Sequence, residues 1–108
     1  MVTNTETFHE TCLFYDHYGD VISLDDWCKL RSDSIYCMIG KTQVYNYVVS
    51  TIWTGIDLGY HPDIPIIFET MVFDKDGNGI EQIRYSNIFT AQAGHGAMIK
   101  EYSLQRAE

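Results

Sequence analysis

Apolar and polar residues alternate through the middle of the chain in a way that is typical of β-strands. The run VYNYVVSTIWTGI at 44–56 is rich in β-branched and aromatic residues, and two later runs share this character. The pattern predicts strands at about 47–55, 66–74 and 80–85, arranged as an antiparallel meander. The polar stretch GKTQ at 40–43 predicts a turn before the first of them.

The N-terminal third has the signals of a short strand followed by a short helix. TCLFYD at 11–16 is typical of a strand, and HYGD at 17–20 of its turn. Ser23 precedes the segment LDDWCKLRS, with Asp26 three residues later, which is an N-cap arrangement with acids in the first turn. A helix is therefore expected over about 24–32.

The C-terminal segment has helical periodicity. Five residues share one stripe at helical spacing: Ile88, Ala91, His95, Ile99 and Tyr102. Ser86 is the expected N-cap. Gly94 and Gly96 each cost a helix interior about 1 kcal/mol relative to Ala, so we expect the helix to pack closely on the sheet at these positions.

The stretch FDKDGNGIEQ resembles the start of a calcium loop but fails the rest of that pattern. Four residues stand where an EF-hand loop has its first three side-chain ligands and its turn glycine: Asp74, Asp76, Asn78 and Gly79. The bidentate Glu at position twelve is replaced by Tyr85, and an acidic residue, Glu81, takes the apolar eighth position. Strand-like segments flank the loop, so a hairpin turn without calcium is expected.

Together these elements predict one α+β domain. We expect a four- to five-stranded, mostly antiparallel sheet with two helices over residues 1–108, with 1–10 as a flexible segment. The length of 108 residues suits a single domain with its own core, and apolar residues make up 45% of the chain. No run approaches the ~20 apolar residues of a membrane span, and the N-terminus lacks the features of a signal peptide, so a cytoplasmic location is expected.

The charge balance argues against direct binding of nucleic acid. Seven Lys and Arg against 15 Asp and Glu give a net charge of −8, and such a surface repels phosphate. Two interpretations of the acidity remain: a surface that keeps the protein in solution, or one matched to a basic groove on a partner. No pattern for a cofactor or metal site is present.

Several segments resemble a group of small, usually hypothetical proteins of bacteriophages and actinobacteria. The segments that carry this resemblance span roughly residues 13–99 and are FYDHYGDVISLDDWCKL, VVSTIWTGID, PIIFETMVF, RYS and AGHGAMI. The chain has Leu58 where the group tends to have His, although His61 lies close by, and GYHPDIP where its loop is glycine-rich. The resemblance implies a phage-type accessory protein in the cytosol of a bacterial host, and it implies no established activity.

Three residues are candidates for catalysis. Glu69 stands within an otherwise apolar strand and needs a partner if it is buried. Arg84 is expected roughly opposite it across the hairpin. If the last helix covers the sheet face that bears Glu69, His95 would join them, and a carboxylate orienting an imidazole could serve general acid/base chemistry. The alternative is a structural ion pair and a hydrogen-bonded core histidine.

Both faces of the long central strand are apolar, and one of them is a candidate interface. Tyr45, Tyr47, Val49 and Trp53 share one face, and Val48, Ile52 and Ile56 share the other. Two helices cannot easily cover both, so we expect Tyr47 and Trp53 to contact a partner or a second copy in a two-fold dimer. The alternative is a half-exposed strand surface.

A second candidate interface is acidic. Seven acidic residues in the first third of the chain outnumber Lys29 and Arg31. Among them, Asp20, Asp25 and Asp26 are expected to steer a basic partner, or else to form a solvated face. The leading hypothesis is a protein that inhibits a bacterial defence system or another host protein, one with a basic nucleic-acid-binding groove. A small enzyme using Glu69, Arg84 and His95, and a minor virion or assembly component, are the alternatives.

Overall fold

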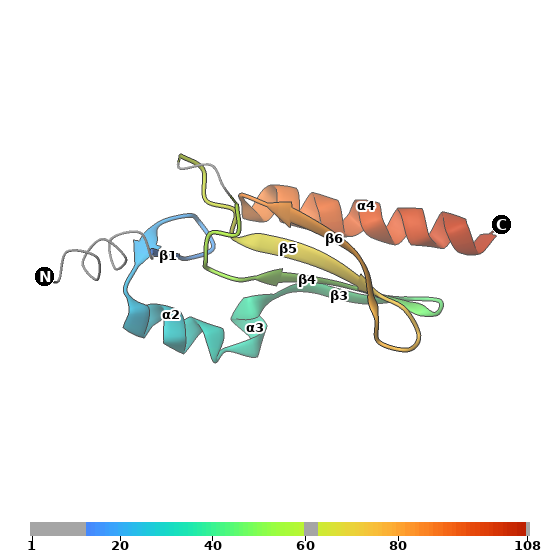
Figure 1. Ribbon diagram of the computed structural model, residues 1–108, viewed down its shortest axis with the longest axis horizontal. Coiled ribbons are helices and arrows are strands. Elements are labelled where there is room, and N and C mark those ends of the chain that lie inside the picture. Colours follow the sequence, from blue (N-terminus) through green and yellow to red (C-terminus); the bar gives the residue numbers. More distant parts are fainter. Residues whose placement is uncertain (1–12, 60–62, 108) are drawn as a thin grey trace, which may run out of the picture.

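A four-stranded antiparallel sheet and a long helix form the body of the protein (Figure 1). The computed structural model describes residues 13–59 and 63–107, so the expectation for residues 1–10 lies outside the described chain. In chain order the elements are β1 Phe14–Tyr15, β2 Val21–Ile22, α2 Leu24–Arg31, α3 Ser34–Cys37, β3 Met38–Val44, β4 Tyr47–Trp53, β5 Phe68–Phe73, β6 Gly79–Tyr85 and α4 Ile88–Ala107. The expected α+β class is confirmed. The short helix α3 and the separate two-stranded sheet β1–β2 add to the expected elements.

The main sheet is the expected meander with one additional strand. Its order is β3-β4-β5-β6, and every neighbouring pair is antiparallel. The expected turn at 40–43 is wrong, because Lys41 pairs with Ser50 and Thr42 with Val49 inside β3. Polar composition does not distinguish a turn from an edge strand here, since an edge strand tolerates polar residues along its length. The chain instead reverses at the two residues 45–46 between β3 and β4.

The β5–β6 connection is the expected hairpin. One carboxylate oxygen of Asp74 accepts the backbone N–H groups of Asp76 and Asn78, each at 2.9 Å. Gly77 supplies a positive φ of 85°. These hydrogen bonds, that of the Asn78 N–H above all, lower the pKa of Asp74. The carboxylate that would begin a calcium loop therefore serves to close the turn.

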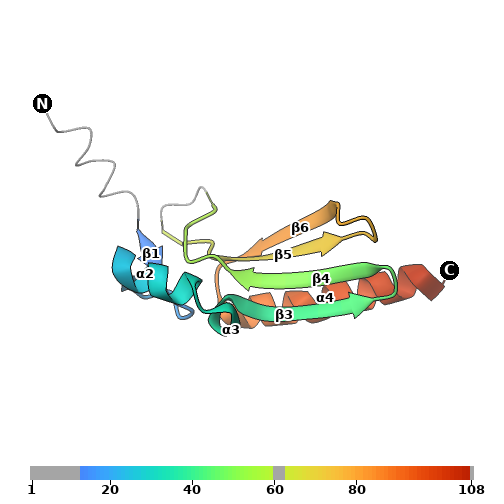
Figure 2. The same ribbon diagram turned by 90° about the horizontal axis from the view of Figure 1, so that it is seen from below.

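Strand alternation gives the sheet two different faces. The helix-covered face is the one on which α4 packs, and its buried strand residues are Val44, Val49, Thr51, Trp53, Phe68, Thr70 and Val72. The open face is the opposite one, and its residues are Met38, Lys41, Gln43, Val48, Ser50, Ile52, Glu69, Met71, Phe73, Gln82 and Arg84. Figure 2 views the sheet from the open face, with α4 behind it.

The N-terminal elements pack at one end of the sheet, away from the β5–β6 hairpin (Figure 1). The Ser23 side chain accepts the Asp26 N–H at 3.1 Å, which confirms the expected helix start. The Trp27 indole donates to the Thr54 carbonyl at 3.0 Å, and Arg31 donates to the Trp53 carbonyl at 3.1 Å. These contacts fix α2 to the chain at the end of β4.

The N-cap of the last helix lies one residue later than the cap expected from the sequence. Asn87, not Ser86, accepts the Thr90 N–H on its side-chain oxygen at 2.9 Å. Both residue types are good N-caps, so the sequence could not choose between neighbours. From the expected stripe of α4, Ala91 and Tyr102 are buried. Met98 is buried as well and joins Tyr102 in a core cluster with Val44.

Candidate functional site

The centre of the helix-covered face carries a chain of polar side chains. His95 of α4 is hydrogen-bonded through Nε2 to Thr42 Oγ1 at 3.0 Å and through Nδ1 to Thr51 Oγ1 at 2.7 Å. Thr51 Oγ1 is in turn 2.5 Å from Thr70 Oγ1. The chain therefore runs from the edge strand β3 across β4 to β5, beneath the helix.

The imidazole fits this place because the strand beneath it lacks a side chain. A Cβ on Gly40 would lie 2.8 Å from His95 Nε2, which is closer than real contacts allow. Thr51 and Thr70 are fully buried, and burial lowers the pKa of His95 below its ordinary value. The arrangement is that of a neutral, partly buried histidine whose hydrogen bonds hold α4 in register on the sheet.

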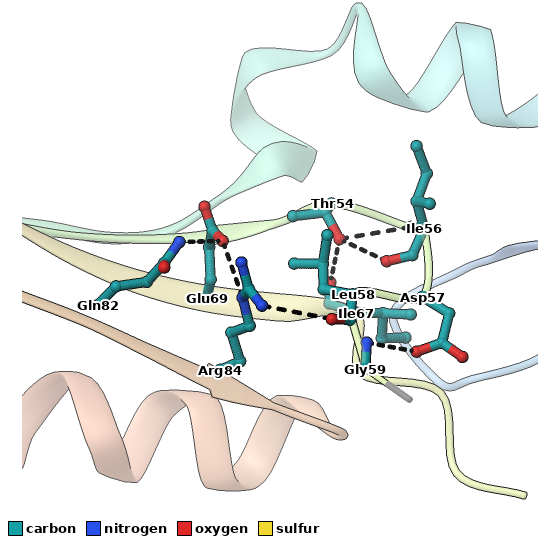
Figure 3. A network of polar contacts seen from close by, with 9 residues as sticks. All are labelled: Thr54, Ile56, Asp57, Leu58, Gly59, Ile67, Glu69, Gln82 and Arg84. Carbon is teal, nitrogen blue, oxygen red and sulfur yellow. Dashed lines mark hydrogen bonds and ion pairs between the residues drawn. The ribbon is translucent and has the colours of Figure 1, made fainter. Parts of the chain in front are cut away.

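Glu69 and Arg84 lie together on the open face (Figure 3). His95 lies on the other side of the sheet, where it is hydrogen-bonded to Thr51. Glu69 and Arg84 are direct partners in the β5–β6 register, as the hairpin numbering predicts. Arg84 Nε lies 3.8 Å from Glu69 Oε2, and Gln82 Nε2 donates to the same oxygen at 3.0 Å. Arg84 also donates to the Leu58 carbonyl at 3.4 Å. The pair thus links the hairpin to the chain that follows β4.

The three candidate catalytic residues are therefore not brought together. Thr70 follows Glu69 directly in β5 and points to α4, so Glu69 must point away from it. The sequence hypothesis required α4 to cover the face that bears Glu69, and α4 covers the other face. The expected ion pair is confirmed, and the expected convergence with His95 is wrong.

The carboxylate of Asp57 holds the loop after β4 together through hydrogen bonds to the loop backbone. Asp57 Oδ1 accepts the N–H groups of Gly59 and Ile66, each at 2.9 Å. Figure 3 shows Asp57 directed at the Gly59 amide. His61, which stands near the position where the resembling group of proteins tends to have His, lies outside the described residues.

The aromatic interface expected on β4 is also wrong. Trp53 has no exposed surface, and it joins Ile67, Phe68 and Ala91 in the core. Tyr47 packs edge-on against Tyr102 of α4, with ring centroids 4.8 Å apart. Both faces of β4 are apolar in sequence, so the sequence does not determine which one α4 covers. The helix covers the face that bears Tyr47 and Trp53.

The acidic candidates lie at the surface beside exposed apolar side chains. Within residues 18–26, which we call the acidic end, Tyr18, Val21 and Leu24 are 79%, 60% and 55% exposed. Asp20, Asp25 and Asp26 are exposed in the same nine-residue stretch. Within the part of the chain that the structure describes, their carboxylates make no hydrogen bond or ion pair.

Two neighbouring acidic residues differ from these three because their carboxylates accept hydrogen bonds from the backbone nearby. Asp16 Oδ1 accepts the N–H groups of Tyr18 and Asp20 at 2.9 and 3.0 Å and so shapes the β1–β2 turn. Asp33 caps α3 by accepting the N–H groups of Ile35 and Tyr36. The carboxylates of Asp20, Asp25 and Asp26, by contrast, have no partner among the described residues, and these three are the acidic candidates that the sequence indicates.

The comparisons with known proteins give no match to a family model, to a curated protein or to a solved structure. Among the helices that the structure describes, none has the length and apolar character required to cross a bilayer. The surfaces described above are therefore the basis for a functional proposal.

Proposed function

We propose that the protein acts by binding another protein through the acidic end. The observation that carries this proposal is the exposure of Tyr18, Val21 and Leu24 next to free carboxylates. Large apolar side chains supply the contact area that anchors an interface, and surrounding charges steer the encounter. In a globular protein without a binding partner, large apolar side chains are more stable when they are buried in the core.

The chemistry of the acidic end indicates the class of partner. Three free carboxylates without an intervening cation suit a basic surface, such as the groove of a protein that handles nucleic acid. The two basic residues of α2, Lys29 and Arg31, follow in its last turn. Arg31 is already engaged with the Trp53 carbonyl, so its charge is directed towards the sheet.

In its most concrete form, the proposal is a small phage-type accessory protein that inhibits a bacterial defence system or another host protein. The resemblance of its segments to small phage proteins and the net charge of −8 support this form. The enzyme alternative loses its support, because Glu69 and Arg84 lie on one face of the sheet and His95 on the other.

A charge-reversal comparison tests the proposal. The protein is immobilised and used to capture partners from bacterial lysate, beside the variant D25K/D26K and the control D76K/E101K. The control has the same change in charge but places it on exposed residues at the hairpin and in the second half of α4. A partner retained by wild type and control but lost by D25K/D26K supports the acidic end. Equal retention on all three contradicts it.

A further inference from the structure

We propose that the open face of the sheet is the contact between two copies of this chain. Four of its apolar side chains are on the two central strands: Val48 and Ile52 on β4, and Met71 and Phe73 on β5. The edge strands contribute polar residues to the same face, chiefly Lys41 and Gln43 on β3 and Gln82 and Arg84 on β6. An apolar centre with a polar rim is the usual composition of a protein interface.

The charge of the open face makes it the described surface on which two copies repel each other least. The chain as a whole carries −8, so most surfaces of two copies repel each other. The charged residues of the open face are Lys41, Arg84 and Glu69. Because basic residues slightly outnumber acidic ones on this face, two copies can approach through it without bringing their acidic surfaces together.

The strand order also makes the face self-complementary. A two-fold axis parallel to the strands reverses the order β3-β4-β5-β6, so β4 of one copy meets β5 of the other. The mainly apolar central strands then pack on each other, and the edge strands, whose residues on this face are mainly polar but include Met38, stay at the rim. Two sheets packed face to face in an aligned manner form a common β-sandwich contact.

Glu69 is the acidic residue near the centre of this contact, and its charge is already balanced within each copy. Gln82 donates to its Oε2 at 3.0 Å, and Arg84 Nε lies 3.8 Å from the same atom. A carboxylate with partners of its own costs much less to bury than an unpaired one. The side chain is only 17% exposed even in the single copy.

Sedimentation or light scattering at about 100 μM, where a dimer of micromolar dissociation constant is largely formed, tests the proposal. Wild type should have twice the chain mass. Ser50→Lys adds a charge in the middle of the face without removing any core atom, and Val48→Lys does so at an apolar site; both should give the mass of a single chain. The matched control is Phe89→Lys, at a 74% exposed residue of α4, and it should remain dimeric.

Circular dichroism and thermal melting of each variant separate dissociation from unfolding, and Ser50→Lys is the variant expected to keep the wild-type spectrum. A wild-type mass of one chain at this concentration would overturn the proposal. A folded Ser50→Lys variant that keeps the dimeric mass would overturn it equally. Dissociation by D25K/D26K in place of the open-face variants would move the contact to the acidic end.

Discussion

At the scale of single residues, His95 shows what the sequence could and could not reveal. Its position on the apolar stripe of the last helix was readable from spacing alone. Its partners were not, because Thr42 and Thr51 come from two different strands, and their relation to α4 depends on which face the helix covers. The face that α4 covers also separates His95 from Glu69. Because the sequence does not determine this face, it could not show that His95 is a structural residue and not part of a catalytic group.

Stability should depend on the protonation of His95. Burial lowers its pKa in the folded state, so below pH of about 6.5 the unfolded chain binds more protons than the folded chain. The contribution of the neutral imidazole is therefore fully present above that pH and is lost as the pH falls through the folded-state pKa. Urea unfolding between pH 7.5 and 5 should show a decline for wild type that is smaller in His95→Gln. Parallel curves for the two proteins would contradict this assignment.

The Glu69–Arg84 pair should contribute modestly. In a single copy the Arg84 side chain is 43% exposed and the ion-pair distance is 3.8 Å, so in dilute protein, where the copies are separate, solvent screens the attraction. We expect a coupling free energy below about 1 kcal/mol in a double-mutant cycle of Glu69→Ala and Arg84→Ala. A coupling of several kcal/mol would show that the ion pair is less exposed to solvent than it is in a single copy.

At the scale of elements, hydrophobic patterning predicted β4, β5, β6 and α4, and the Ser23 cap with its acidic first turn predicted α2. Periodicity failed for β3, whose polar residues 40–43 belong to an edge strand that pairs with β4. It also left α3 unassigned, since four residues are too few to show a period. The docking of α4 depends on side-chain packing across the whole sheet, which no local pattern contains.

The two glycines in α4 should respond to substitution in opposite directions. A Cβ on Gly94 would collide with the Tyr85 ring and hydroxyl, whereas a Cβ on Gly96 would meet open space. Gly94→Ala should therefore destabilise the fold by about 1–3 kcal/mol through overpacking. Gly96→Ala should stabilise it by about 0.5–1 kcal/mol, because alanine is the better helix former. Equal effects in thermal unfolding would contradict the close approach of α4 to β6.

The β5–β6 hairpin should not respond to calcium. Its Asp74 carboxylate is occupied by backbone N–H groups of the turn, and Tyr85 stands where the bidentate ligand of an EF-hand would be. We expect the melting temperature to be unchanged in about 2 mM calcium, because a ligand that does not bind the folded state cannot stabilise it. A micromolar dissociation constant by calorimetry would refute this.

At the scale of the whole molecule, the surfaces are divided along its length. The acidic end lies with the N-terminal elements, and the β5–β6 hairpin lies at the opposite end of the sheet (Figure 1). The open face lies between them, opposite α4 (Figure 2). Partner binding at the acidic end and pairing of copies through the open face therefore use separate residues, and each can be removed without the other.

The most direct test of the protein-binding account is the rate of association with a captured partner as salt is raised from about 50 to about 500 mM, a range over which exposed charges become screened. The account predicts that wild type and D76K/E101K associate fast at low salt and clearly more slowly at high salt. It predicts that D25K/D26K associates slowly throughout while its melting temperature stays close to that of wild type. An association rate for D25K/D26K equal to that of wild type, with no dependence on salt in either protein, would contradict the account.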